Sequence, residues 1–115
     1  MKAVIKKARL LHVSDVWKVH KPQGLGFSDT EIITVAAQEE GGRLVEQDFY
    51  CRLKADGTLA HSITKRSEKR QRELQSFIRK YVSKEKAYNV RAGIGEWKGK
   101  EVELEKVDNV IIIKI

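Results

Sequence analysis

Hydrophobic and polar residues along the first half of the chain follow patterns that predict a β-hairpin. The segment "EIITVAAQE" at 31–39 is apolar on both faces, which is typical of a buried strand. Gly41–Gly42 forms a turn signal, and "RLVEQDFYCRLK" at 43–54 then alternates cleanly, as half-buried strands do. Its apolar side is made of Val45, Phe49, Cys51 and Leu53, and its polar side carries Glu46, Asp48, Tyr50, Arg52 and Lys54.

Four other segments carry weaker strand signals. Residues 2–13 combine β-branched and other apolar side chains, and this pattern favours a strand over a helix without deciding the matter. "YNVRA" at 88–92 is a short strand candidate, and "EVELEK" at 101–106 alternates. A turn at 108–109 then precedes the strongly β-branched "VIIIKI" at 110–115.

One principal helix is predicted at about 64–84, with Ser62 or Thr64 as the N-cap. Its apolar residues recur at helical spacing, and all of them lie in its C-terminal half: Leu74, Phe77, Ile78, Tyr81 and Val82. Residues 65–73 offer no apolar side chain to bury. The first half of this helix must therefore project into solvent or onto a partner.

These elements predict an α+β fold for 1–115, a single compact domain with an antiparallel β-sheet and one principal helix. A helix that follows three strands and precedes further strands resembles the OB-like barrel. In that fold nucleic acid binds across the sheet and the loops between strands 1–2 and 4–5. The corresponding loops here are 19–30 and 93–100. The extra strand at 88–92 and the basic helix depart from the OB pattern, and the resemblance concerns fold alone.

The net charge of +7 is concentrated on the helix and its exit. Residues 63–91 carry ten Lys and Arg against three acids, a net of +7, while 1–62 and 92–115 contribute +1 and −1. The cations in "TKRSEKRQREL" lie near the helix N-terminus, where the helix dipole disfavours positive charge. Such clustering is typical of a polyanion partner, although a solvated helix face is the alternative.

Catalytic and metal signatures are absent from the sequence. Cys51 falls on the apolar side of its strand, and the three histidines share no metal-ligand spacing. The "GLG" and "GIG" segments match no nucleotide-binding fingerprint. Alternating glutamates at 101–105 are typical of a solvated strand face. We therefore expect no enzyme activity, no cofactor and no metal site.

Two glycine-rich loops each carry an aromatic residue, "QGLGF" with Phe27 and "GIGEWKGK" with Trp97. Trp97 lies between Glu96 and Lys98, which predicts a surface position, and Tyr50 falls on the polar side of its strand. Single-strand-binding proteins combine cationic grooves with aromatic faces on which bases stack. Packing of these aromatic side chains over the core edges is the alternative.

The sequence therefore predicts a nucleic-acid-binding protein that contacts phosphates through its basic helix, with single-stranded DNA or RNA slightly favoured over duplex. Anions of the partner would then satisfy the helix terminus that the cations oppose. The helix contacts are Lys65, Arg66, Lys69, Arg70, Arg72, Arg79 and Lys80, extended by Lys84 and Lys86. The loop contacts are Phe27, Trp97, Lys98 and Lys100.

The alternative hypothesis is a protein–protein interaction module. In it the basic half of the helix docks on an acidic partner, or the edge at 110–115 pairs with another chain, a homodimer included. The single cysteine, the lack of a signal peptide and the short apolar runs favour a cytoplasmic protein with no membrane segment. Few Met and Cys with many Lys and Glu lean towards a thermophile.

Overall fold

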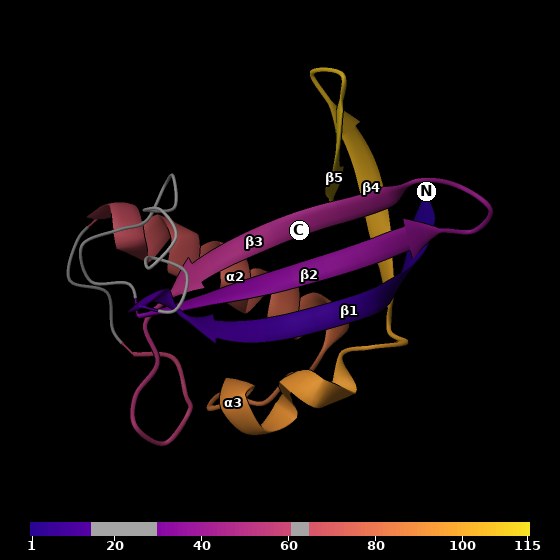
Figure 1. Ribbon diagram of the computed structural model, residues 1–115. Helices are drawn as coiled ribbons and strands as arrows, with labels where there is room; N and C mark the ends of the chain where they lie inside the picture. The colour runs from indigo at the N-terminus through magenta and orange to yellow at the C-terminus, as the bar shows by residue number, and fades with distance from the viewer. Residues whose placement is uncertain (15–29, 61–64) are drawn as a thin grey trace.

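The computed structural model describes residues 1–14, 30–60 and 65–115, with side chains from 68 onward in the last range. Five antiparallel strands form one sheet in the order β3-β2-β1-β4-β5, with the helix α2 between β3 and β4 in the chain (Figure 1). The predicted α+β class is thereby confirmed. The strands are β1 (Lys2–His12), β2 (Glu31–Glu39), β3 (Leu44–Cys51), β4 (Glu101–Val107) and β5 (Val110–Ile113), and α2 is Lys65–Tyr81.

β1 is a strand, as its β-branched content favoured, and it carries an irregularity in its pairing with β2. The register shifts between Ile5 and Lys7, so one extra residue is inserted there. Before this bulge Ala3 and Ile5 point into the core, whereas after it Ala8 and Leu10 pack against the core. The bulge therefore reverses which positions of β1 face outward.

The predicted hairpin and the predicted turn at 108–109 are both present. β2 and β3 pair in register around a turn in which Gly41 has a φ of 64°, a conformation that glycine adopts without strain. Asp108 and Asn109, with φ of 48° and 67°, join β4 to β5. Two consecutive residues with positive φ are the mark of the tight hairpin turn that fits strand twist.

The β4–β5 hairpin projects beyond the other three strands (Figure 1). β5 contacts β3 at the other end of the strand order, and the Ile113 N–H donates to Gln47 Oε1 at 3.3 Å. No backbone ladder joins these two strands in the part of the chain described. The sheet therefore curls towards the barrel of the OB resemblance, but a hydrogen-bonded closure is not seen.

α2 packs behind the sheet through the apolar face predicted for it (Figure 1). Leu74, Phe77 and Ile78 are buried, and the Phe77 ring centroid lies 5.1 Å from that of Phe49 and 5.6 Å from that of Trp97. The helix ends at Tyr81 rather than at 84. The cause is local, since the N–H groups of residues 82 and 83 both donate to the Ile78 carbonyl and turn the chain.

The strand expected at 88–92 is wrong, because the short helix α3 (Val90–Gly93) occupies this segment and a 3-10 turn, η1 (Ile94–Glu96), follows. Asn89 caps α3 by accepting the Ala92 N–H at 3.0 Å, and its Nδ2 donates to the Asp56 carbonyl at 2.7 Å. Val90 is the β-branched residue of 88–92, and its preference for a strand does not outweigh this helix cap. Along the described residues the order is therefore three strands, the principal helix, the short α3 and two strands.

Two further findings bear on the expectations. Among the residues described, no helix combines the length and the apolar character that a membrane crossing requires. The predicted loop at 19–30 lies almost wholly outside the described residues.

Candidate nucleic-acid interface

The outward side of β1, β2 and β3 is called here the sheet face; its β1 and β3 positions are largely exposed, whereas Ile32 and Ala36 on β2 are buried. Its members follow from the strand register, because residues paired across neighbouring strands point to the same side of the sheet. Three rows cross it: Lys7, Ala36 and Glu46; Arg9, Thr34 and Asp48; and Leu11, Ile32 and Tyr50.

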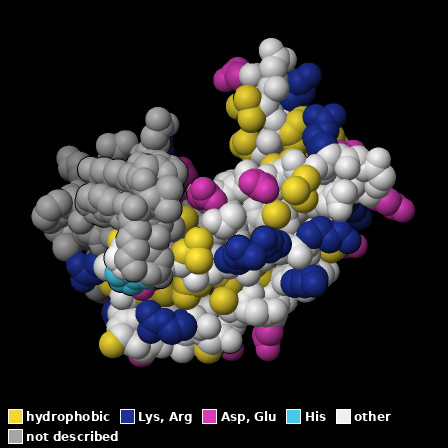
Figure 2. Space-filling view, viewed as in Figure 1, with side chains coloured by type: hydrophobic (Ala, Val, Ile, Leu, Met, Phe, Trp, Pro, Cys, Tyr) yellow, Lys and Arg dark blue, Asp and Glu magenta, His cyan; other side chains and the backbone are white. Residues whose placement is uncertain are grey.

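Charge on the sheet face is divided between its two outer strands. Lys7 and Arg9 lie on β1, whereas Glu46 and Asp48 lie on β3, and Figure 2 shows basic side chains over β1 and acidic ones over β3. Two strand spacings, roughly 10 Å, separate the two rows of backbone. Small side chains of β2 lie between them, and no ion pair links these cations to these acids in the described part of the chain. The β1 edge is therefore the one suited to phosphates.

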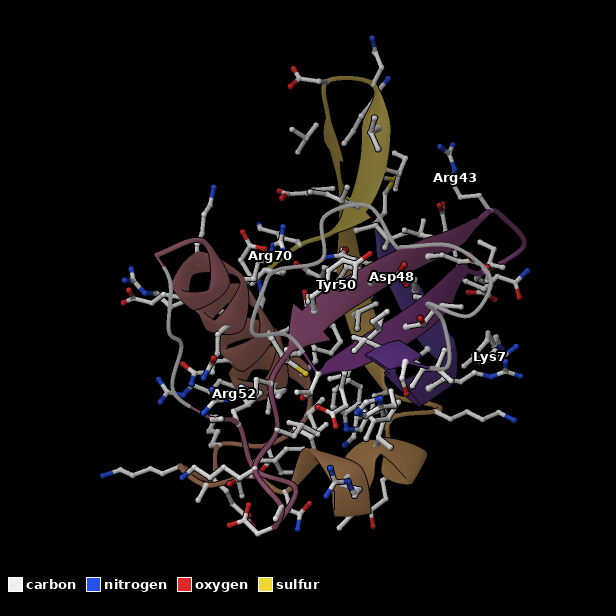
Figure 3. The ribbon with its side chains drawn as sticks, turned by 60° about the vertical axis from the view of Figure 1, so that its left-hand side comes forward. Lys7, Arg43, Asp48, Tyr50, Arg52 and Arg70 are labelled. Atoms are coloured by element: carbon white, nitrogen blue, oxygen red, sulfur yellow. The ribbon has the colours of Figure 1, made fainter. Side chains whose placement is uncertain are left out.

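Tyr50 and Arg70 meet at the α2 end of the sheet face. The Arg70 guanidinium carbon lies 5.4 Å from the centre of the Tyr50 ring, which is cation–π distance, and both side chains are half-buried. Figure 3 shows Arg70 reaching from α2 towards Tyr50, with Lys7 farther away across the same sheet face. Arg52, two residues beyond Tyr50, is half-buried as well. An aromatic ring with a guanidinium group over it thus lies on the sheet face.

The first half of α2 carries the cations that the sequence singled out. Lys65 and Arg66 lie in the helix, and their side chains are outside the description. Lys69 is exposed, and so is Arg72, which forms an ion pair with Glu68 at 2.5 Å. Exposed helix pairs of this spacing contribute only about 0.3–0.5 kcal/mol. Arg72 can therefore exchange this partner for a phosphate at little cost.

Arg79 and Lys80 lie at the other end of α2, in its last turn. Cations at a helix C-terminus are favoured by the dipole and need no external anion there. Both side chains are exposed, and the Lys80 ammonium lies 5.5 Å from the centre of the Tyr81 ring. These two residues stand apart from the group near Tyr50.

The expectation that Trp97 lies at the surface is wrong. Its side chain is fully buried, and its Nε1–H donates to Tyr88 Oη at 3.0 Å. The η1 turn and the backbone bond from Gly99 to the Ile5 carbonyl, at 2.8 Å, hold this segment against β1. Charged neighbours in sequence do not fix the direction of a side chain in a tight turn. Trp97 is therefore a core residue and offers no face to a nucleobase.

The other predicted loop contacts are Lys98, Lys100 and Phe27. Lys98 is exposed and Lys100 is half-buried, and the Lys100 carbonyl accepts from the Ile5 N–H at 2.9 Å, beside the bulge in β1. Both lysines therefore lie next to the β1 strand. Phe27 lies outside the described residues.

Lys7 and Arg9 are candidate contacts that the sequence pattern did not reveal. A bulge hides the alternation of β1. The outward positions are even-numbered before Lys6 and odd-numbered after it. Arg52 was recoverable, since the alternation of 43–54 places it on the same side as Tyr50. The other members of the sheet face can be assigned only from the pairing register of the strands.

No catalytic arrangement emerges among the described residues. Cys51 is buried, and no group of three His, Cys, Asp or Glu side chains in the described ranges could hold a metal ion. The carboxylate of Glu31, only 7% exposed, accepts from the Leu53 N–H at 3.2 Å and lies 3.6 Å from Arg91. It thereby ties the end of β3 to α3.

Comparison with protein-family models, curated proteins and solved structures finds no match to this chain. A function therefore has to be argued from the sheet face and its surroundings.

Proposed function

We propose that this protein binds single-stranded DNA or RNA across the sheet face. The observation that carries the proposal is the contact of Tyr50 with Arg70 on the sheet face, together with the exposed Lys7 and Arg9 on its β1 side. Base stacking on an aromatic side chain contributes about 1–3 kcal/mol and tolerates any sequence. Phosphate contacts supply the remaining, salt-dependent part of the binding free energy.

The acids of β3 give the bound strand a preferred path. Glu46 and Asp48 repel phosphates, so the backbone runs along the β1 edge or past α2, and the bases turn towards Tyr50. Lys98 and Lys100, held beside the β1 bulge, extend the cationic edge.

Support also comes from the first turns of α2. Lys65 and Arg66 occupy the start of the helix, where the dipole disfavours cations. A bound phosphate would offset this repulsion and interact favourably with the helix N-terminus. The order of three strands, helix and two strands agrees with the OB-fold, whose sheet face binds oligonucleotides, and this agreement is analogy only.

The test is fluorescence anisotropy with labelled single-stranded DNA, RNA and duplex at low and moderate salt. The double variant Lys7→Ala/Arg9→Ala and the single variant Tyr50→Leu should each weaken single-strand binding about tenfold or more. Tyr50→Leu should do so with little change in salt dependence, because it removes stacking and no charge.

A matched control is Lys106→Ala/Lys114→Ala, which removes the same charge from β4 and from the end of the chain. Its affinity should stay within a factor of about two of the parent. Equal losses in both double variants would show that only net charge matters, and the sheet face would then not be the interface.

A protein-binding function is the second candidate, favoured by the projecting hairpin. Val107 and Val110, at its turn, are 44% and 58% exposed, and Figure 2 shows apolar side chains on this hairpin. Apolar groups held away from the core are typical of contact surfaces. This module would show no affinity for generic oligonucleotides, and Val107→Ser/Val110→Ser would abolish its contact with a partner or second copy.

A further inference from the structure

A pocket of about 250 Å³ lies between α2, the turn at 54–59 and the segment that leads to α3. Cations line it from all three sides: Lys54 from the turn, Arg79 from α2 and Lys86 from the third segment. The acid among the lining residues is Glu85. Apolar contact is offered by Leu59 and by the buried side chain of Ile78. The pocket therefore combines positive charge with a small apolar wall.

The turn that carries Lys54 is fixed by a set of hydrogen bonds. The Lys54 N–H donates to the Thr58 carbonyl at 2.8 Å, and the Val90 N–H donates to the Gly57 carbonyl at 3.0 Å. Arg91 donates to the Ala55 carbonyl at 3.0 Å. α2, on the other side, is anchored by its buried apolar face. These walls are held in place before any ligand arrives, which lowers the entropic cost of binding.

In the described residues, no salt bridge joins Lys54, Arg79 or Lys86 to a carboxylate. Asp56 is the acid that lies near Lys54 in the turn, and its carboxylate already accepts both the N–H and the hydroxyl of Thr58, at 2.9 and 2.7 Å. An anion in the pocket would therefore find three basic groups and two glutamine side chains around it, with Glu85 as the acid of the lining.

We propose that this pocket binds a phosphate monoester, with the phosphate between Lys54, Arg79 and Lys86 and the organic part on Leu59 and Ile78. Guanidinium and ammonium groups bind phosphate by charge-assisted hydrogen bonds, and arginine does so with a planar fork. The volume is below the roughly 300–1,000 Å³ of sites for drug-sized ligands, which favours a small ester. The pocket shares no residue with the sheet face, so this site is independent of the proposed function.

The phosphate monoester could be a free small molecule or the terminal phosphate of an oligonucleotide. The two sources are separated by titrating the full chain with glycerol phosphate and with short oligonucleotides that carry either a 5′-phosphate or a 5′-hydroxyl. Amide and side-chain NMR shifts of pocket residues report binding directly. A free-ester site responds to glycerol phosphate, and a chain-end site responds more strongly to the phosphorylated oligonucleotide than to its hydroxyl twin.

Three variants sharpen the test. Arg79→Gln should weaken glycerol phosphate binding about tenfold. Glu85→Gln removes the acid of the pocket and should strengthen it. Lys84→Gln is the matched control, since it removes an exposed cation next in sequence to the pocket residues but not among those lining it, and should change the affinity less than about twofold.

Two outcomes would overturn the proposal. One is the absence of ligand-dependent shifts at Gln75, Lys86 and Tyr88 with every phosphate probe. The other is equal weakening by Arg79→Gln and Lys84→Gln, which would mean diffuse attraction by net charge only. Thermal unfolding of each variant without ligand separates loss of the site from loss of the fold.

Discussion

Trp97 and Tyr50 show how the same chemical class takes opposite roles at the residue scale. Both are aromatic side chains with a polar atom, and both have charged residues within two positions in the sequence. The Trp97 indole is fully buried with its N–H bonded to Tyr88, whereas the Tyr50 ring is half-buried at the sheet face beneath Arg70. The backbone direction at each position decides whether the ring packs in the core or lies at the sheet face, where we propose that it stacks on a base.

Substitution of these two residues should therefore have different consequences. Trp97→Ala should lower the free energy of unfolding by about 3–5 kcal/mol, because it leaves a large cavity beside Phe77 and an unpaired tyrosine hydroxyl. Tyr50→Ala should cost roughly 1 kcal/mol or less and weaken oligonucleotide binding. Urea unfolding and anisotropy on the same preparations measure both effects. A marginal stability loss for Trp97→Ala would contradict its position in the core.

Asp56 provides a prediction about pH. Hydrogen bonds from the Thr58 hydroxyl and N–H lower the pKa of this carboxyl below its ordinary value of 3.8, with nearby Lys54 and Arg91 acting in the same direction. A group with a lowered pKa in the folded state stabilises the fold above its unfolded pKa and loses that contribution as the pH falls through the folded value.

Asp56→Ala should therefore unfold more easily than the parent near neutral pH, and the difference should shrink as the pH drops below 3.8. Urea unfolding of Asp56→Ala and of the parent over a pH series measures this difference in stability. The fully exposed position of Asp56 makes the effect small. A difference that grew towards acid pH would show that the Thr58 bonds do not favour the charged carboxylate.

At the scale of elements, the start of α2 sets charge against the helix dipole. Replacing Lys65 and Arg66 with Glu should raise the free energy of unfolding by about 0.3–1 kcal/mol for each residue, because acids suit the first turn. The same change should weaken oligonucleotide binding. Lys80→Glu, in the last turn, is the control and should destabilise the helix instead. Urea unfolding shows whether each variant is more or less stable than the parent. A Glu variant that is stabilised and keeps full oligonucleotide affinity would show that Lys65 and Arg66 do not take part in binding.

Most elements were predictable from local pattern. The β2–β3 hairpin, the β4–β5 turn and the buried face of α2 follow from alternation, turn residues and helical spacing, which are signals within a short window. α3 was not predicted, because its cap depends on Asn89, which also bonds the Asp56 carbonyl far away in sequence. The segment 88–92 also carries a strand-favouring Tyr and Val.

The candidate site was only partly predictable, because it also depends on contacts between residues far apart in the sequence. Arg70 and Tyr50 each lay in a correctly read element, but their contact depends on how α2 packs against β3. Lys7 and Arg9 were hidden by a bulge, which pattern reading cannot locate without the partner strand. Trp97 was placed wrongly, because a turn of the 3-10 type directs its side chain inward.

Over the whole molecule, the basic groups fall into separate regions rather than one field. Lys7, Arg9 and Arg70 lie at the sheet face, whereas Lys54, Arg79 and Lys86 surround the pocket. A net charge of +7 would attract polyanions without any defined site, with a salt dependence set by the number of phosphates contacted. Salt dependence can therefore tell a defined interface from general attraction.

The sheet face predicts a specific change in that dependence. Each lost phosphate contact lowers the slope of log affinity against log salt by about 0.7 for a single strand, so Lys7→Ala/Arg9→Ala/Arg70→Ala should lower it by roughly 2. Arg79→Gln/Lys86→Gln, with two charges removed at the pocket, should leave the slope of an oligonucleotide without a terminal phosphate nearly unchanged. Anisotropy titrations at several salt concentrations give both slopes. Slopes that fell in proportion to the charge removed, wherever it was removed, would assign oligonucleotide binding to the whole charged surface and not to the sheet face.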